Sequence, residues 1–199
     1  MNDVVTSLAA GASQTSADDY ADLPSLSPLL YEHIVRDALR EDLGRAGDIT
    51  TDSIVPADAV QDVALVCRKD GAVAGIDVAA MAFQLIDPKV VFKVEKPDGS
   101  RVVVGDVLAT IDGPARALLT AERVALNFLS HMSGIATVTR AIADAISEHK
   151  ARIICTRKTT PGLRALEKYA VRAGGGGNHR FGLDDGVLIK DNHVAIAGG

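Results

Sequence analysis

A stretch near the carboxyl end, TRKTTPGLRALEKYAVRAGGGGNHR (156–180), concentrates positive charge in a chain that is acidic overall. It holds six Lys and Arg residues and one acid, Glu167, whereas the whole chain has 21 Lys and Arg against 26 Asp and Glu. Arg binds carboxylates and phosphates through a planar fork, and Lys supplies a compact point charge. The segment therefore predicts a site for a small ligand that carries several anionic groups.

Apolar runs on either side of the cationic stretch predict a strand–helix–strand unit of an α/β fold. ARIICT (151–156) and GVLIK (186–190) have the composition of short buried strands. The carboxyl ends of parallel strands meet at one edge, where ligands bind in such folds. Arg157, Lys158 and Lys190 are therefore expected to point into one mouth.

The helix between these strands is predicted to begin at Thr160 and Pro161 and to end in the glycines at 174–177. Glycines there allow a ligand to approach the backbone, yet they match neither common nucleotide-binding glycine motif. Four-residue spacing on this helix is shared by Arg164, Lys168 and Arg172. Such spacing fits either anion binding or a solvated helix face, and we favour the solvated face.

The remainder of the chain predicts a mixed α+β unit. Residues 1–26 are polar and are expected to form a flexible tail, and a helix should run from Pro28 to Gly44. Alternating apolar residues predict strands around 63–67, 92–94 and 107–111. The boundaries expected are 27–132 for an amino-terminal sandwich and 133–199 for part of an α/β barrel.

Helical periodicity resumes at Thr120 and continues from Ile135 through Ile146. Ser133 and Gly134 lie between the two periodic runs. Two helices are therefore expected, and the Ser-Gly pair is either a break between them or a point of tight packing.

Composition excludes several classes of protein. A net charge of −5 argues against a general nucleic-acid binder. Cys67 and Cys155 stand in apolar runs without metal-ligand spacing, so neither a disulfide framework nor a metal site is expected. The amino end lacks the basic region of a secretory signal, and no apolar run is long enough for a membrane span, so a cytoplasmic protein is expected.

Several long motifs in order resemble the quinolinate phosphoribosyltransferase (nicotinate-nucleotide pyrophosphorylase) family. They are EDLGRAGDITTDSIVP, LTAERVALNFLSHMSGIAT, the cationic stretch itself and LIKDNHV, and together they extend over roughly residues 28–199. The resemblance implies an open α+β sandwich followed by an incomplete α/β barrel. It also implies transfer of phosphoribosyl from 5-phosphoribosyl-1-pyrophosphate to quinolinate with decarboxylation, which gives nicotinate mononucleotide, pyrophosphate and CO₂ in NAD biosynthesis.

The resemblance also implies roles for particular residues. Lys158 and Lys190 take catalytic positions facing the phosphoribosyl donor, and Arg123 reaches into the active site of a partner subunit, which implies a homodimer at least. Mg²⁺ is expected to accompany the donor, with protein ligands downstream of residue 199. The substrate-binding positions are Arg123, Thr156, Arg157, Lys158, His179, Arg180 and Lys190.

Two alternatives remain open on the sequence. One is a related phosphoribosyltransferase that acts on nicotinate or a pyrimidine-like acid, including the homologue associated with molybdenum transport. The other is a lipoyl- or biotinyl-like carrier, because PDGSRVVVGDVLATIDG resembles the hairpins of those domains. A carrier needs a displayed lysine within its own motif, and neither Lys93 nor Lys96 stands in one.

The carboxyl-terminal portion is short for a barrel. Only 66 residues run from Gly134 to Gly199, whereas a complete α/β barrel takes at least about 200 residues. The chain is therefore expected to have exposed apolar strand edges and little activity alone.

Overall fold

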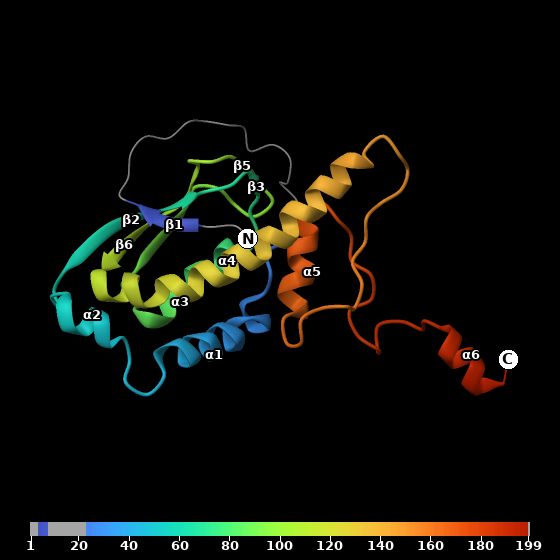
Figure 1. Cartoon of the computed structure of the whole chain (residues 1–199), viewed down its shortest axis with the longest axis horizontal. Coiled ribbons are helices and arrows are strands. Elements are labelled where there is room, and N and C mark those ends of the chain that lie inside the picture. The colour runs from blue at the N-terminus through green and yellow to red at the C-terminus, as the bar shows by residue number, and fades with distance from the viewer. Residues whose placement is uncertain (1–3, 8–22, 199) are drawn as a thin grey trace.

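The computed structural model describes residues 4–7 and 23–198 of the 199-residue chain. The strands are β1 (Val4–Ser7), β2 (Val60–Cys67), β3 (Gly71–Ala72), β4 (Val91–Val94), β5 (Arg101–Val102) and β6 (Val107–Pro114). The helices are the 3₁₀ turn η1 (Pro28–Leu30), α1 (Glu32–Leu43), α2 (Ile49–Ile54), α3 (Ile76–Ile86), α4 (Ala115–Ala145), α5 (Arg164–Ala173) and α6 (Asp191–Ala197). Figure 1 shows α4 as the long diagonal element between the sheet and α1, with α5 crossing its carboxyl-terminal half.

The main sheet is antiparallel with strand order β1-β2-β6-β4, and β3 pairs with β5 in a separate ribbon. Leu65 of β2 lies opposite Ala109 of β6, and both side chains are fully buried. One face of the sheet joins α3 and α4 in a single hydrophobic core. The predicted strands around 63–67, 92–94 and 107–111 and the helix up to Gly44 are confirmed. β2, β6 and α1 each bury apolar side chains in this core, whereas β4 contributes only the partly buried Phe92.

The prediction of a flexible tail at 1–26 is wrong at Val4–Ser7, which forms β1. This strand pairs antiparallel with β2, from Val4 opposite Cys67 to Ser7 opposite Ala64. The outer edge of β2 offers unpaired backbone N–H and C=O groups, and a Val-Val-Thr segment favours the extended conformation that satisfies them. The rest of the predicted tail up to residue 22 lies outside the described residues.

A single helix, α4, runs through the point where two helices were predicted. At 31 residues it is about 46 Å long, taking 1.5 Å per residue. Ser133 is a site of tight packing rather than a break, because its hydroxyl accepts a hydrogen bond from the Ala74 N–H (3.1 Å) and donates to the Ala74 carbonyl (3.2 Å). The small residues there allow the loop before α3 to approach the helix, while the helical hydrogen bonds remain intact.

The predicted strands at 151–156 and 186–190 do not form. Among residues 23–198, this region contains one isolated parallel bridge, between Ile154 and Gly177. A parallel strand needs a neighbouring strand to satisfy its backbone, and 186–190 has none in the described residues. Its apolar side chains are exposed, Val187 by 93%, so exposed apolar groups are confirmed while strand edges are not.

Helix α5 begins at Arg164, later than the predicted start at Thr160 and Pro161. Gly162 interrupts the helical path with a φ of +83°, a left-handed value that an α-helix does not tolerate. In the described part of the chain, no helix combines the length and apolar character needed to cross a membrane.

Candidate functional site

Two loops, 156–160 and 178–182, carry most of the predicted site residues and are called the cationic loops. They leave the bridge between Ile154 and Gly177 side by side and in parallel. The Cys155 N–H donates to the Gly177 carbonyl (3.0 Å), and the Gly177 N–H donates to the Ile153 carbonyl (2.9 Å). A Cβ at Gly177 would come within 3.2 Å of the Ile154 side chain, so glycine permits this approach.

Register beyond the bridge pairs the predicted ligand residues. Arg157 lies three residues past Ile154, and Arg180 lies three residues past Gly177. Thr156 and His179 are similarly two residues past the bridge. The two loops therefore carry two arginines and a histidine, from separate sequence motifs, at equal distances along the chain from one bridge.

Both arginines have buried donors without a protein acceptor. The Nε atoms of Arg157 and Arg180 are buried and form no hydrogen bond within the described residues. Arg180 does use Nη1, which donates to the Gly186 carbonyl (2.7 Å). Native proteins seldom leave a buried donor unpaired, because its desolvation costs about 1–3 kcal/mol. An anionic ligand between the loops would supply the missing acceptors.

The polar face of α5 holds the cationic loops. Arg164 Nε donates to the Thr159 hydroxyl (3.1 Å), and Arg164 Nη1 donates to the Phe181 carbonyl (3.1 Å). The same guanidinium lies 6.0 Å from the centroid of the Phe181 ring. One arginine thus fastens both loops to the helix.

Glu167 makes the next contact along α5. Its Oε2 accepts a hydrogen bond from the Thr160 N–H (3.1 Å), and its Oε1 lies 3.0 Å from Nε2 of His131 on α4. Burial raises the pKa of the Glu167 carboxyl, but the hydrogen bonds from Thr160 and His131 outweigh it and leave the pKa below its ordinary value. Sequence reasoning could not find this role for His131, since 36 positions separate it from Glu167.

Lys168 corrects the interpretation of α5 as a solvated basic face. Its side chain is buried, and its ammonium donates to the Cys155 sulfur (2.8 Å) and to the His179 carbonyl (2.9 Å). It therefore contacts the residue that directly precedes the first loop and a residue of the second loop, close to the bridge. The basic spacing on α5 did not reveal this, because one acceptor is a backbone carbonyl and the other a distant thiol.

Helix α5 is seated on the amino-terminal unit through Arg140 of α4. The buried guanidinium donates to the carbonyls of Gly174 (3.2 Å), Ala173 (2.9 Å) and Gly99 (3.1 Å). The first two carbonyls end α5, where a cation also complements the helix dipole. Gly174 lies so close to α4 that a Cβ there would collide with the Ala136 carbonyl.

A second contact at this joint involves Asp98. Its Oδ1 accepts the Ile76 N–H at the start of α3 (2.9 Å). Burial raises the Asp98 pKa above its ordinary value although hydrogen bonds from Ile76, Gly75 and Tyr169 oppose the shift. The pKa of Tyr169, on α5, is also raised, first by burial and then by the Asp98 charge.

Not every predicted site residue joins the two loops. Lys158 does lie there, and its N–H donates to the Thr156 hydroxyl (3.1 Å). Lys190 does not share a mouth with them, which corrects that prediction: it is the N-cap residue of α6, on the arm that extends away from α5 in Figure 1. The cause is that 186–190, lacking a partner strand, does not return to the bridge.

Arg123 lies on α4 with its side chain exposed. It is eight residues before His131, which corresponds to about 12 Å along the helix. Within the described residues it has no hydrogen bond or ion pair. As far as the described residues go, its guanidinium is available to contact another molecule.

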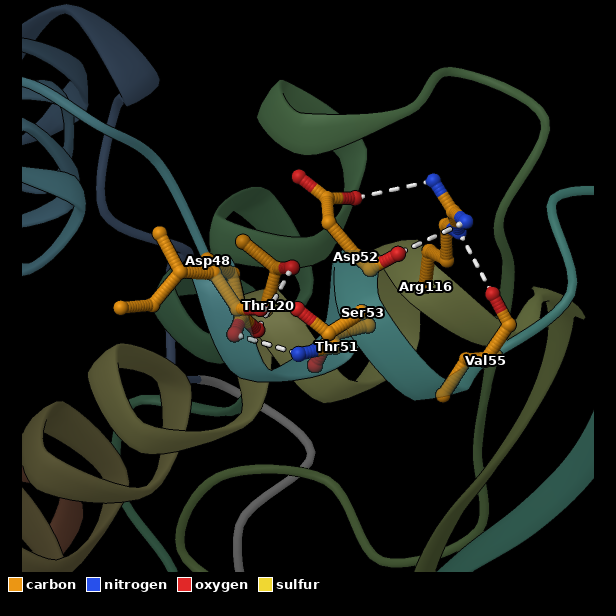
Figure 2. Close-up of polar contacts among 8 residues, drawn as sticks. Asp48, Thr51, Asp52, Ser53, Val55, Arg116 and Thr120 are labelled. Carbon is orange, nitrogen blue, oxygen red and sulfur yellow. Dashed lines mark hydrogen bonds and ion pairs between the residues drawn. The ribbon is translucent and has the colours of Figure 1, made fainter.

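Figure 2 shows how the segment around α2 is tied to α4 by a brace of polar contacts. Asp48 caps α2 by accepting the Thr51 N–H (2.9 Å), and its other oxygen accepts the Thr120 hydroxyl (3.2 Å). The bonds from Thr51 lower the Asp48 pKa. Thr120 is three positions before Arg123, so the brace fixes the turn of α4 that carries this arginine.

Arg116 completes the brace in Figure 2. It donates to the Val55 carbonyl (2.9 Å), the Asp52 carboxylate (2.9 Å) and the Asp52 carbonyl (3.2 Å). Both ends of the short helix α2 are therefore tied to α4.

The carrier alternative finds no support in the geometry. Lys96 forms an ion pair with Asp106 at 3.8 Å, and its side chain is only 15% exposed. Lys93 lies within β4 and pairs with Glu95 at 2.7 Å. Neither lysine is displayed at the tip of a hairpin. Among the described residues there is also no cluster of three or more His, Cys, Asp or Glu side chains that would hold a metal ion.

The chain matches two family models. The model of the quinolinate phosphoribosyl transferase N-terminal domain matches residues 48–133, and that of the C-terminal domain matches residues 135–199. The structure is similar to that of NadC from Streptococcus pyogenes, with a TM-score of 0.84 and 44% identity over 88% of this chain and 62% of that one. A nicotinate-nucleotide pyrophosphorylase from Francisella tularensis has a TM-score of 0.84 and 36% identity over 91% and 64%.

Curated relatives agree with the family models. A nicotinate-nucleotide pyrophosphorylase [carboxylating] of Mycobacterium leprae is 54% identical over 168 residues, which cover 82% of this chain and 58% of that protein. A probable enzyme of the same name from Bacillus subtilis is 48% identical over 79% of this chain and 54% of that protein. The chain thus spans somewhat more than half the length of these relatives. It belongs to the quinolinate phosphoribosyltransferase family.

Proposed function

We propose that the protein transfers phosphoribosyl from 5-phosphoribosyl-1-pyrophosphate to quinolinate and releases CO₂ and pyrophosphate, giving nicotinate mononucleotide. The observation that carries the proposal is the pair of buried, unpaired Nε donors on Arg157 and Arg180. Each lies three residues past the bridge between Ile154 and Gly177, one on each cationic loop. Quinolinate has two adjacent carboxylates, so it supplies several acceptors from one small rigid molecule.

Electrostatics explains why so many cations are needed. Quinolinate and the donor are both polyanions, and they repel each other unless the protein offsets their charge. The cationic loops carry Arg157, Lys158 and Arg180, and the buried ammonium of Lys168 lies just behind them. We assign Arg157, His179 and Arg180 to quinolinate, and Lys158 to the face toward the donor.

The reaction needs positioning and charge stabilisation more than covalent catalysis. Pyrophosphate leaves C1 of the ribose with the bonding electron pair, and the pyridine nitrogen forms the new bond from the opposite face through an oxocarbenium-like transition state. The 2-carboxylate then departs as CO₂ and leaves its bonding electron pair on C2, where the charge of the adjacent positively charged ring nitrogen stabilises it until a proton binds to C2. Cationic side chains that hold both substrates in line supply most of the rate enhancement.

Mg²⁺ is proposed to arrive with the donor, whose pyrophosphate oxygens are the hard ligands that this ion prefers. The described residues offer no cluster of three or more potential metal-ligating side chains. No role in the reaction steps is therefore assigned to a protein-bound ion in this part of the chain.

The site is proposed to be shared between two subunits of a homodimer. The exposed, unpaired Arg123 supports this proposal, because α4 carries it away from the cationic loops of its own chain. An Arg123→Ala variant mixed with an Arg157→Ala variant should regain activity through hybrid dimers. Mixtures that stay as inactive as their parents after proven subunit exchange would contradict a shared site.

The substrate assignment is tested by isothermal titration of the protein with quinolinate, nicotinate and the phosphoribosyl donor. A charge-assisted hydrogen bond contributes about 1.5–3 kcal/mol, so Arg180→Ala should weaken quinolinate binding roughly tenfold to a hundredfold. Nicotinate should bind the unmodified protein poorly, because it lacks the second carboxylate. Tight nicotinate binding would instead favour the related transferase, and equal loss of all three ligands in Arg180→Ala would make Arg180 a general electrostatic residue.

A further inference from the structure

Lys168 is the most deeply buried basic side chain next to the cationic loops, with 2% of its surface exposed. Its ammonium joins the loops directly, through Cys155 at 2.8 Å on one side and the His179 carbonyl at 2.9 Å on the other. The Cys155 thiol in turn lies 3.3 Å from the Asn178 side-chain oxygen. These contacts form a continuous polar link across the gap between the loops.

A buried ammonium at this place needs an explanation. In the part of the chain that the structure describes, Lys168 bonds to no carboxylate, and its neighbour Glu167 is directed toward Thr160 and His131. Removing an ammonium from water costs several kcal/mol unless a counter-charge compensates. Methionine has a similar length and would fill the same space without that cost. Packing alone therefore does not account for lysine.

The positions of the two acceptors indicate the function of the charge. Cys155 precedes Thr156 and Arg157, and the His179 carbonyl precedes the Arg180 N–H, so each contact lies at the base of a ligand-binding segment. The backbone bridge between Ile154 and Gly177 and the contact of the Cys155 thiol with Asn178 are the other connections there. One isolated bridge is a weak constraint, since it lacks the neighbouring hydrogen bonds of a ladder.

We propose that Lys168 is a positioning residue that acts as a strut between the two cationic loops. It sets the separation of Arg157 and Arg180, and thereby the spacing of their unpaired Nε donors. The identity of the ligand rests on the proposed function, whereas the strut itself does not. Arg164 fastens the same loops farther along, at Thr159 and Phe181, so loss of Lys168 loosens the loops at their base without detaching them.

Hydrogen exchange and titration on matched variants test the proposal. Lys168→Met removes the ammonium, and Arg172→Met is the control: it lies one turn later on α5, and the Arg172 side chain has no hydrogen bond or ion pair within the described residues. In Lys168→Met the amides of Cys155 and Gly177 should exchange at least tenfold faster, and quinolinate should bind at least tenfold more weakly. Arg172→Met should change both quantities less than twofold, and amides of β2 and β6 should report an intact fold in each variant.

A second pair of variants keeps the test independent of how well Lys168→Met folds. Cys155→Ser preserves an acceptor for the ammonium, whereas Cys155→Ala removes it. The serine variant should retain the slow exchange of the Gly177 amide, and the alanine variant should exchange faster and bind quinolinate more weakly. Equal exchange rates of the Gly177 amide in Cys155→Ser and Cys155→Ala would overturn the strut proposal.

The remaining outcomes are also decisive. Unchanged exchange in a folded Lys168→Met protein would overturn the proposal, including the case in which affinity falls, because Lys168 would then act by charge and not by position. If Lys168→Met exchanges faster but the unmodified protein does not bind quinolinate, the proposed function is refuted and the strut proposal stands.

Discussion

Replacing Arg140 by Met should cost the protein much of its stability. The guanidinium makes three hydrogen bonds, of 2.9, 3.1 and 3.2 Å, to carbonyls that belong to α5's end and to the turn at Gly99. A methionine of similar reach fills the space and bonds to none of them. Arg140→Met therefore separates the loss of hydrogen bonds from the loss of volume.

The magnitude follows from the acceptors left behind. Each net hydrogen bond contributes about 1 kcal/mol, and a charged donor raises that figure. Losing the three bonds and the cation at the helix terminus together costs about 4 kcal/mol. Part of this loss is offset because the variant no longer buries a charged guanidinium. We expect a decrease of about 3 kcal/mol in the free energy of unfolding, a large share of the usual 5–15 kcal/mol.

Urea titration followed by far-ultraviolet circular dichroism measures this change. The midpoint should fall for Arg140→Met, whereas Arg152→Met, at an exposed position, should stay within about 0.5 kcal/mol of the parent. A loss below about 1 kcal/mol in Arg140→Met, with an unchanged slope, would refute the view that this arginine seats α5.

Three further perturbations test the joint and the brace. Burial raises the Asp98 pKa above its ordinary value of 3.8. The stability that protonated Asp98 contributes is therefore fully present below pH 3.8, and it is lost as the pH rises through the pKa of the folded state. Asp98→Asn should remove this part of the pH dependence of the thermal midpoint. Arg116→Met should cost about 1 kcal/mol in a thermal melt because it removes two bonds to backbone carbonyls, whereas Asp52→Ala, which removes an exposed partner, should cost less than about 0.5 kcal/mol. Gly174→Ala should destabilise by about 1–3 kcal/mol in urea, since its Cβ meets the Ala136 carbonyl; a neutral result would mean that α5 moves freely on α4.

The sequence predicted those elements whose pattern matches a local burial rule. Alternation in 63–67 and 107–111 predicted β2 and β6, which present one face to the core. The same reasoning failed at 186–190, where an apolar run is compatible with a strand but has no strand beside it. A pattern specifies what a segment prefers, and pairing decides whether the preference is satisfied.

The continuity of α4 was hidden for a different reason. Ser133 and Gly134 are poor helix formers, and they mark a break in many sequences. Here the serine hydroxyl bonds to the backbone of Ala74, 59 positions away. A tertiary contact of this kind stabilises the helix where its residues have low helix propensity, and local propensities cannot predict such a contact.

The prediction of a solvated face for α5 failed at Lys168 for a geometrical reason. Leu166, Tyr169, Ala170 and Ala173 form the buried stripe toward α4. Lys168 lies about 200° around the helix from Leu166, at 100° per residue, so a single-stripe reading assigns it to solvent. The helix is in fact covered on both faces, by α4 on the apolar side and by the cationic loops on the polar side. An amphipathic pattern reveals only the first of these.

Burial on both faces couples ligand binding to the seating of α5. The loops reach their geometry through Arg164, Glu167 and Lys168, and these residues are held in place only while Arg140 and its partners keep the helix on α4. If seated and loosened forms interconvert, apparent affinity falls in proportion to the seated fraction. By the same linkage, a ligand that binds the seated form stabilises it by RT ln(1 + [L]/Kd). If quinolinate is the ligand, as proposed, Arg140→Met should weaken its binding although Arg140 does not contact it, and saturating quinolinate should restore part of the lost free energy of unfolding.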